Sequence, residues 1–273
     1  MPEGDTVWRQ ARDLRAVFEG QTLTASNFRV PAYATLDLSG SVVSSVQSRG
    51  KHLLMFVGGL AIHSHLSMEG HWDIYPRSAD GRAAKWRRPA FTARVVLTTE
   101  RAAAVGFSLG TLEVLPETLV EDAVGHLGPD LLGSDWDAEE ALHRLLAVPD
   151  RAVGLALLDQ QNLAGIGNIY RNELCFLGGI HPAAPVREVP DLARIIALAK
   201  RLLEANKDRS ARSTTGGPAR GDAASWVYGL AGKPCKRCGT LIRHDKLADP
   251  AFPARGARDI YWCPRCQPLP HQA

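Results

Sequence analysis

Long apolar runs and a basic leader are both missing from this sequence of 273 residues. No window approaches the ~20 consecutive apolar residues that a membrane-spanning helix needs. The chain begins with Met1-Pro2-Glu3-Gly4-Asp5, whereas a secretory signal begins with basic residues that lead into an apolar stretch. Because 45% of the residues are hydrophobic, the chain can still bury real cores and is not disordered by composition. We therefore expect a soluble, cytoplasmic protein.

Cysteine is scarce as well, yet four of the five cysteines form two CxxC pairs, Cys235/Cys238 and Cys263/Cys266. In a reducing compartment such pairs favour metal over disulfides, and together they offer the four soft ligands of a tetrahedral zinc site. The 24 residues between the pairs exceed the usual spacing of about 15 to 20. The connecting hairpin therefore needs an extra loop, which we assign to residues 249–254. The fifth cysteine, Cys175, is interpreted as a buried apolar residue on a helix.

Lysine contributes only 7 of the 32 basic residues, and the net charge of +3 is small. The charge is unevenly spread, however. Residues 200–273 hold 14 Lys and Arg against 6 Asp and Glu, a net charge of +8, so residues 1–199 carry −5. A basic end on a mildly acidic body is typical of a protein that docks a polyanion there, and the alternative is a solvated basic tail.

Residues 22–115 form short β-like segments separated by turn signals. The six predicted strands cover residues 23–30, 42–48, 52–57, 60–66, 91–98 and 102–107. Gly58-Gly59 predicts a hairpin turn between two of them. Strands without long helices between them predict an antiparallel sandwich of about 110 residues. A helix capped by Asp5 and ended by Gly20 precedes the strands, because apolar residues recur there at helical spacing.

The pattern becomes helical near Pro116, with helices predicted over residues 138–147, 151–160, 169–176 and 190–206. The stretch 208–221 is rich in Ser, Thr, Gly and Arg, which suits a mobile loop. The fold class is thus α+β with several domains. We predict an N-terminal antiparallel β-sandwich with a leading helix at 1–116, a helical domain at 117–222 and a four-cysteine zinc-finger β-hairpin at 223–273.

The amino terminus combines a nucleophile with an acid/base. An initiator Met is normally removed before a small residue, which would leave Pro2 as a free secondary amine beside the carboxylate of Glu3. An α-amino group titrates near 7.7 to 8.0, so roughly a tenth of it is unprotonated and nucleophilic at neutral pH. Its attack on an aldehyde-like carbon such as a sugar C1′ gives an iminium ion, which is a strong electron sink. The alternative is an ordinary chain start.

Three further positions point to anion binding, each with a structural alternative. Asn168 follows a Gly-Ile-Gly turn at a predicted helix start, where amide N–H groups and the helix dipole can seat a phosphate; the alternative is a tight structural turn. Lys51 precedes a predicted strand as a compact point charge; the alternative, a surface lysine, is the more common case. Arg258 leads into the second CxxC pair, where bound zinc would fix the strand so that the planar guanidinium group can bind a phosphate. The alternative is an exposed salt bridge.

The order of these motifs resembles that of the bifunctional DNA glycosylases of the formamidopyrimidine-DNA glycosylase and endonuclease VIII family. The resemblance covers nearly the whole chain. In the N-terminal part it consists of the PEG start, a GK before a strand, and an SH...G.W pattern formed by Ser64, His65, Gly70 and Trp72. Further along, it consists of the GIGNIY turn, VYG before the first CxxC, and an arginine before the second. GIGNIY and the VYG with CKRCG are the specific matches.

The resemblance implies a role for each catalytic candidate. Pro2 is the nucleophile that forms a Schiff base at C1′, Glu3 is the general acid/base, and Lys51 contacts the phosphate and sugar of the damaged nucleotide. It also implies that the helical domain is a helix-two-turn-helix domain. Asn168 and Arg258 would then bind DNA phosphates, and Met68 would be the wedge that fills the space left by a flipped-out nucleotide. For Met68 the alternative is core filling.

Departures from the family pattern bear on the substrate. Thr6 stands where the formamidopyrimidine branch has a further glutamate, and residues 99–107 lack that branch's arginine-phenylalanine pair. The missing pair and the PEG start favour the endonuclease VIII branch, which removes oxidised pyrimidines and nicks DNA by β,δ-elimination. Asp5 and Thr6 replace the proline and glutamate that are usual even in that branch, so the chain resembles a divergent subgroup of it. The alternatives are an oxidised-purine glycosylase and a zinc-containing lesion-binding protein with lost catalysis. We expect a nucleoid-associated bacterial monomer with damaged DNA as partner, one structural zinc ion and no small-molecule cofactor.

Overall fold

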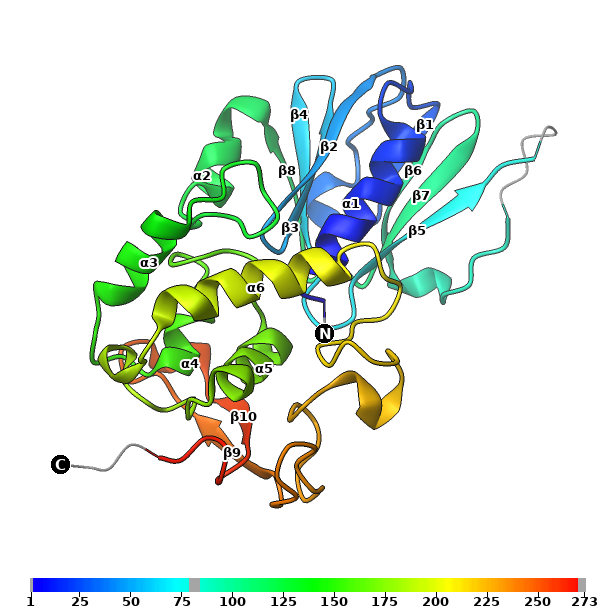
Figure 1. Cartoon of the computed structure of the whole chain (residues 1–273). Coiled ribbons are helices and arrows are strands. Elements are labelled where there is room, and N and C mark those ends of the chain that lie inside the picture. The colour runs from blue at the N-terminus through cyan, green and yellow to red at the C-terminus, as the bar shows by residue number, and fades with distance from the viewer. Residues whose placement is uncertain (1, 79–83, 270–273) are drawn as a thin grey trace. The chain divides into compact units, whose positions relative to one another are not determined.

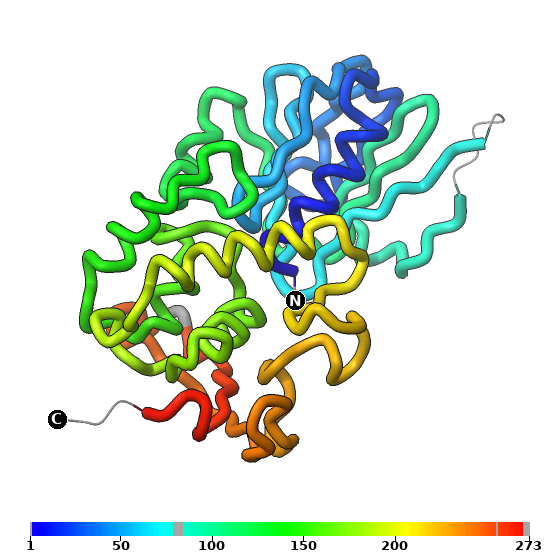
Figure 2. Tube along the Cα trace, in the orientation of Figure 1, coloured from blue at the N-terminus to red at the C-terminus, as the bar shows by residue number. Residues whose placement is uncertain are grey.

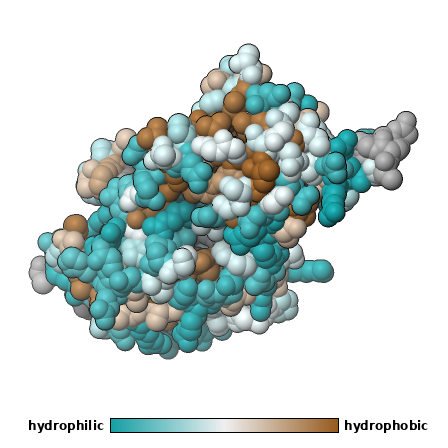
Figure 3. Space-filling model, turned by 90° about the horizontal axis from the view of Figure 1, so that it is seen from above, coloured by the Kyte–Doolittle hydropathy of each residue, from teal (hydrophilic) through white to brown (hydrophobic). Residues whose placement is uncertain are grey.

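The computed structural model describes residues 2–78 and 84–269, and the chain divides into two compact units, Met1–His126 and Leu127–Ala273. Figures 1 and 2 follow the chain through both units. The expected removal of Met1 concerns a residue outside the described ones. None of the helices described is long and apolar enough to cross a membrane. Hydrophilic side chains prevail over the face seen in Figure 3, with apolar ones in small groups.

The first unit is a leading helix packed on two antiparallel four-stranded sheets (Figure 1). The helix is α1, Gly4–Phe18. One sheet has the order β2-β3-β4-β8, formed by Val43–Arg49, His52–Val57, Leu60–His65 and Thr111–Pro116. The other has the order β1-β6-β7-β5, formed by Ala25–Phe28, Ala93–Thr98, Ala102–Phe107 and His71–Pro76. The short helix α2, Val120–Val124, follows. The predicted β-sandwich is confirmed.

The core of this unit explains why α1 sits where it does. Its apolar residues return every three or four positions, so Ala11, Leu14 and Phe18 form one buried stripe. That stripe shares a single apolar cluster with Met55 of β3 and Leu97 of β6. The helix therefore joins the cores of both sheets, and its amino-terminal end is fixed relative to them.

Two local predictions for this unit need comment. The prediction that Asp5 caps α1 is wrong: Glu3 is the N-cap residue, and Asp5 lies in the first turn, where its Oδ1 accepts from the Thr6 amide at 2.7 Å. A carboxylate in the first turn interacts favourably with the helix dipole without being the cap. The Gly58-Gly59 turn is confirmed, because both residues have positive φ (57° and 79°) between the paired strands β3 and β4.

Strands β5 and β8 lie in the predicted β region but are not among the six predicted strands. Both are edge strands of their sheets. An edge strand is covered on fewer sides than a central one, and β8 has no fully buried residue. Its sequence pattern is therefore weaker than that of a central strand such as β7, in which every residue is buried.

The second unit consists of helices followed by a β-hairpin (Figure 2). The helices are α3 Ala138–Leu146, α4 Val153–Ala156, α5 Asn168–Gly178 and α6 Leu192–Asn206, and the hairpin strands are β9 Arg243–Leu247 and β10 Arg258–Trp262. The predicted helix over 151–160 is wrong in extent, since α4 has four residues. The chain turns beyond it, where the side-chain Nε2 of Gln160 donates to the carbonyls of Leu158 (2.7 Å) and Ile166 (2.9 Å).

The core of this unit lies between α5 and α6, where Tyr170 and Leu174 pack with Ile195 and Leu203. Cys175 of α5 is buried in the same cluster, and burial raises the pKa of its thiol to about 12. The thiol therefore stays protonated and behaves as an apolar side chain, as predicted.

Candidate functional site

Pro2 and Glu3 lie at the entrance of α1. Pro2 is half-buried and Glu3 is fully buried. The Glu3 carbonyl accepts the first helical hydrogen bonds, from the amides of Thr6 (2.9 Å) and Val7 (3.1 Å). The main chain of Glu3 is thus fixed by α1, which in turn is anchored in the core of the unit. The positive end of a helix dipole also favours a neutral amine over an ammonium group.

Lys51 lies in the turn that joins β2 to β3. Gly50, with φ of 57°, makes the turn possible, and Lys51 is half-buried beside it. The charge of Lys51 contributes to lowering the pKa of both His52 and His65, after the larger effect of burial. The Lys51 charge is thus coupled to two imidazoles, an effect that the sequence does not predict.

Met68 lies in the loop between β4 and β5 and is 63% exposed. The alternative that it fills the core is therefore wrong. The loop has a defined shape: Ser67 has φ of 54°, its amide donates to His65 Nδ1 at 3.1 Å, and the Gly70 amide donates to the Leu66 carbonyl at 2.8 Å. A built loop that exposes an unbranched apolar side chain has the form that an inserting wedge requires.

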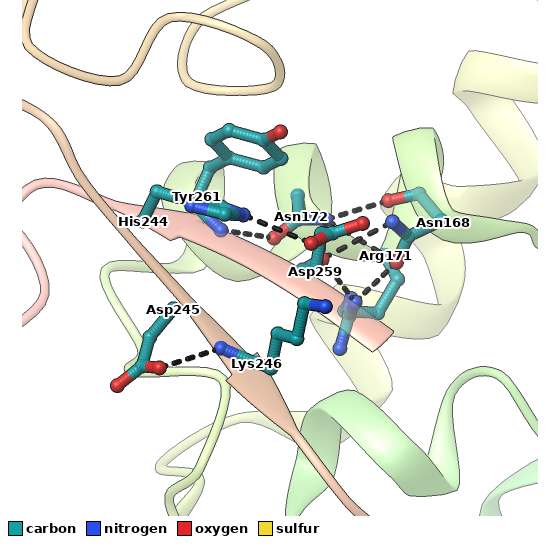
Figure 4. A network of polar contacts seen from close by, with 8 residues as sticks. All are labelled: Asn168, Arg171, Asn172, His244, Asp245, Lys246, Asp259 and Tyr261. Atoms are coloured by element: carbon teal, nitrogen blue, oxygen red, sulfur yellow. Dashed lines mark hydrogen bonds and ion pairs between the residues drawn. The ribbon is translucent and has the colours of Figure 1, made fainter. Parts of the chain in front are cut away.

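Asn168 is the first residue of α5 and is buried. Its Oδ1 accepts from the Arg171 guanidinium, and its Nδ2 donates to the carbonyl of Asp259 at 3.1 Å (Figure 4). The side chain is thus used to join α5 to the hairpin. An anion at this helix end would bind main-chain N–H groups, because the side-chain amide of Asn168 already bonds to Arg171 and Asp259.

Arg258, the first residue of β10, is exposed, and the strand behind it is tied to α5. The carbonyl of Asp259 accepts from Asn168, from Arg171 Nη2 at 2.8 Å and from Asn172 Nδ2 at 3.3 Å, as Figure 4 shows. Asn172 Oδ1 also accepts from the amide of Tyr261 at 2.7 Å. Hydrogen bonds at Asp259 and Tyr261 therefore tie the strand that carries Arg258 to the first turn of α5.

Sequence reasoning did not identify Arg171, Asn172 or Glu173 as functional. The three are fully buried polar residues in a row on α5. Buried polar groups need hydrogen-bond partners. The sequence signal that could have identified these residues is a run of polar residues in a helix that also carries Tyr170 and Leu174. Glu173 shows what such a run does: its carboxylate accepts from the amides of residues 226 (2.7 Å), 227 (2.9 Å) and 228 (2.9 Å) and from the Thr214 hydroxyl. It holds the segment that leads to the first CxxC pair.

The four paired cysteines converge at the base of the hairpin. Their sulfur atoms all lie within 4.8 Å of one another, with Cys238 to Cys263 at 3.4 Å and Cys235 to Cys266 at 4.0 Å. Four Zn–S bonds of about 2.3 Å in a tetrahedron place sulfurs about 3.8 Å apart, so the donor set fits one zinc ion. Zinc bound there would be structural, because four protein ligands leave no open position.

The extra hairpin loop is present between β9 and β10, and it is anchored. Arg151 donates to Asp249 at 2.6 Å and to Asp159 at 2.8 Å, and all three side chains are largely buried. This explains how a connection longer than usual remains compatible with the cysteine cluster.

Family models match both units of the chain. The formamidopyrimidine-DNA glycosylase N-terminal domain matches residues 1–108, and the formamidopyrimidine-DNA glycosylase H2TH domain matches residues 127–214.

Curated relatives match along nearly their full length. Probable endonuclease 8 2 of Streptomyces coelicolor is 53% identical, with 99% of this chain and 95% of the relative covered. The DNA-(apurinic or apyrimidinic site) lyase Nei2 of Mycolicibacterium smegmatis is 49% identical, with 98% and 99% covered. Among solved structures, Lactococcus lactis formamidopyrimidine DNA glycosylase bound to DNA with an AP site shares the fold, with a TM-score of 0.77 at 23% identity and 98% and 100% covered. The chain therefore belongs to the formamidopyrimidine-DNA glycosylase and endonuclease VIII family.

Proposed function

We propose that the protein is a bifunctional DNA glycosylase and AP lyase that removes oxidised bases, with pyrimidines as the main class, through a Schiff base on Pro2. Its relatives are named endonuclease 8 and DNA-(apurinic or apyrimidinic site) lyase. The observation that carries the proposal is the position of Pro2 and the fully buried Glu3 at the rigid entrance of α1. A nucleophile and an acid/base on a core-anchored helix have the preorganisation that covalent catalysis needs.

The proposed reaction begins when the unprotonated Pro2 nitrogen, exposed after loss of Met1, attacks C1′ of the damaged nucleotide. The base leaves with a proton that Glu3 helps to supply, and opening of the sugar gives an iminium ion between Pro2 and C1′. Loss of the C2′ proton sends electrons toward the iminium and breaks the 3′ C–O bond. A second elimination breaks the 5′ C–O bond, and hydrolysis releases the sugar fragment. The products are a one-nucleotide gap and free enzyme.

The DNA contacts in this proposal come from both units. Lys51 provides a point charge for the phosphate and sugar of the damaged nucleotide, and the exposed Met68 fills the vacated space. In the second unit, the exposed Arg258 and the first amides of α5 bind phosphates, with Asn168 shaping that helix end. One zinc ion on the four cysteines would hold the hairpin that carries Arg258. We further propose a monomer that acts at the bacterial nucleoid.

The preference for pyrimidines rests on residues 99–107. Thr99 and Ala102 close a tight turn, with the Thr99 amide donating to the Ala102 carbonyl at 2.9 Å, and β7 follows at once with every residue buried. This region offers no long loop that could insert an arginine and a phenylalanine opposite the orphaned base. The oxidised-purine alternative needs such a loop and is therefore less favoured.

A cleavage assay with matched duplexes tests the proposal. Duplexes containing 5-hydroxyuracil, 8-oxoguanine or an abasic site are incubated with the protein, with and without borohydride. We expect cleavage of the 5-hydroxyuracil and abasic duplexes and a covalent protein–DNA adduct with borohydride. Faster cleavage of 8-oxoguanine would favour the purine alternative. Tight lesion binding without scission or adduct would identify a binding protein that has lost catalysis.

Replacing Asn172 with alanine tests how Arg258 is held. The change removes the acceptor of the Tyr261 amide and one donor to Asp259, so we expect a loss of about 1–3 kcal/mol in stability. If Arg258 binds a phosphate, the slope of log affinity against log salt should fall by roughly 0.9, the value for one lost phosphate contact. Asn206→Ala is the control, because Asn206 is equally buried but bonds to Leu202 and Ser213. A normal salt slope in Asn172→Ala would contradict this positioning.

A further inference from the structure

Residues 84–94 carry four basic side chains, Lys85, Arg87, Arg88 and Arg94, and no acidic one. The first unit as a whole holds 13 Lys and Arg against 13 Asp and Glu, so the remainder of it carries a net charge of −4. The charge of +4 is therefore a local concentration that the overall composition hides. We call residues 84–94 the basic segment. Neither the reaction nor the DNA contacts described above use it.

The basic segment packs on the sheet β1-β6-β7-β5, on the face that points away from the main core. Trp86 of the segment joins an apolar cluster with Tyr75 of β5 and Phe107 of β7. Its ring centroid lies 5.6 Å from that of Phe107 and 6.5 Å from that of Tyr75. The Arg87 amide donates to the Tyr75 hydroxyl at 3.1 Å. The main chain of the segment is thus fixed on the sheet.

Two cations of the segment are not used by the fold in this way. Arg88 is used, because its Nε donates to the buried Asp73 at 3.1 Å. Lys85 and Arg87 are exposed, and within residues 2–78 and 84–269 neither side chain makes a hydrogen bond or an ion pair. The Arg87 guanidinium lies over the Tyr75 ring, 5.7 Å from its centroid. Both side chains therefore keep their N–H donors for a ligand, and the planar arginine fork matches a pair of phosphate oxygens.

Strand register places the segment near the loop that exposes Met68. His71, the first residue of β5, and Ala93, the first residue of β6, both pair with Phe107 of β7. Because β7 lies between the two strands (Figure 1), they start at the same end of the sheet, about 10 Å apart. Met68 precedes His71 by three residues, which span at most about 11 Å. The end of the basic segment therefore lies within about 20 Å of Met68.

A DNA duplex fits this arrangement. Each strand of a duplex carries a phosphate about every 3.4 Å, so 20 Å corresponds to about six base pairs. Phosphate contacts carry no sequence information, but they supply affinity and fix the register of the protein on the duplex. An acidic peptide would satisfy the same two cations. The position of the segment beside the Met68 loop, in a member of a DNA glycosylase family, favours DNA over such a peptide.

We propose that the basic segment is a further DNA-backbone site, in which Lys85 and Arg87 bind phosphates of the duplex within about six base pairs of the damaged nucleotide. The proposal rests on the proposed function only in that the damaged nucleotide lies beside Met68. The two side chains contribute to affinity and not to the chemical steps, because they do not touch the reacting atoms.

Salt-dependent binding of the full-length, zinc-loaded protein tests the site, with one undamaged duplex and one that contains a stable abasic analogue. For Arg87→Gln the slope of log affinity against log salt should fall by roughly 0.9, and for Lys85→Gln/Arg87→Gln by roughly 1.8. The corresponding loss at 0.15 M salt, relative to 1 M, is about fivefold per contact and equal for both duplexes. Single-turnover cleavage of an abasic duplex at saturating protein should stay within about twofold of wild type.

Arg101→Gln is the matched control. Arg101 is also exposed and lies in the β6–β7 turn, at the opposite end of the same sheet. The adjacent Ala102 is five strand positions, or about 17 Å, from Phe107. We expect this variant to keep the wild-type slope and affinity. An unchanged slope in the double variant, an equal fall in Arg101→Gln, or a loss confined to the damaged duplex would overturn the proposal.

Shortening the duplex locates the contact. The arms on the two sides of the abasic analogue are cut back separately, from about 12 to about 3 base pairs. Wild-type affinity should drop when one of the arms becomes shorter than about six base pairs. The double variant should lack this drop, because the contact that the arm provides is already lost. The same dependence on arm length in both proteins would refute the assigned location.

The outcome is separable from that of the proposed function. If the wild-type protein forms no borohydride adduct with abasic DNA, the catalytic proposal fails, while the salt slopes still decide the proposal made here. Poly-glutamate serves as the probe for an acidic peptide. A double variant that binds DNA like wild type, but no longer binds poly-glutamate that the wild type binds, would assign the surface to an acidic protein partner and overturn the DNA site.

Discussion

Glu3→Gln is expected to slow removal of a damaged base by about 10²- to 10⁴-fold, the usual contribution of a general acid/base. The change is close to isosteric, and the capping hydrogen bonds to Thr6 and Val7 come from the Glu3 main-chain carbonyl, so α1 should keep its start. Single-turnover kinetics with a 5-hydroxyuracil duplex measure the effect. An abasic duplex bypasses base removal, so the borohydride adduct on Pro2 should still form there.

The matched control is Asp13→Asn, an exposed carboxylate on the same helix. It should leave both steps unchanged. Pro2→Gly complements the pair, since it keeps an α-amine but a primary and less constrained one, and it should reduce the adduct with either duplex. Base removal by Glu3→Gln at the wild-type rate would show that another group supplies the proton. A full adduct yield from Pro2→Gly would instead direct attention to an internal lysine as nucleophile.

Loss of zinc is the second large effect that we expect. Binding of structural zinc supplies an apparent free energy of about 10–16 kcal/mol at neutral pH, and in small domains this is folding free energy. Cys238→Ser, or chelation of the wild-type protein, should therefore unfold the β9–β10 hairpin locally and weaken DNA binding by tenfold or more, because Arg258 is no longer held. Metal content, circular dichroism and a binding titration measure the three consequences.

Cys175→Ala is the control for this experiment, because Cys175 is buried in the helical core and is not part of the sulfur cluster. It should lower stability modestly and leave zinc content at one per chain. A freshly purified wild-type protein with far less than one zinc would remove the metal assignment. Full DNA affinity in a zinc-free Cys238→Ser variant would mean that the hairpin contributes no phosphate contact.

Some features of this protein could be predicted from its sequence because their signals are local. The two CxxC pairs carry their own chemistry, and the spacing of Ala11, Leu14 and Phe18 marks a buried helical face within a few turns. The extra hairpin loop follows from counting residues. In each case the residues that specify the feature are close together in the chain, or bind a common ion whose preferences are known.

Other features depend on partners that are distant in the chain. Asn172 and Tyr261 are 89 positions apart, and His63 and Glu113, which are also hydrogen-bonded, are 50 apart, so neither pair is visible as a motif. The overestimated helix at 151–160 has the same origin, because Arg151 binds both Asp159 and the distant Asp249 in the hairpin loop. Apolar periodicity reports which face is buried, but it does not report which polar group will be found there.

The Glu173 carboxylate has a consequence for local opening of the protein. The amides of Trp226, Val227 and Tyr228 lie outside any helix or strand, where rapid hydrogen–deuterium exchange is the ordinary expectation. Their common acceptor is a fully buried side chain of α5, so they are exposed to solvent only when their hydrogen bonds to that carboxylate break. We therefore expect these three amides to exchange in step with α5, as one unit of cooperative unfolding.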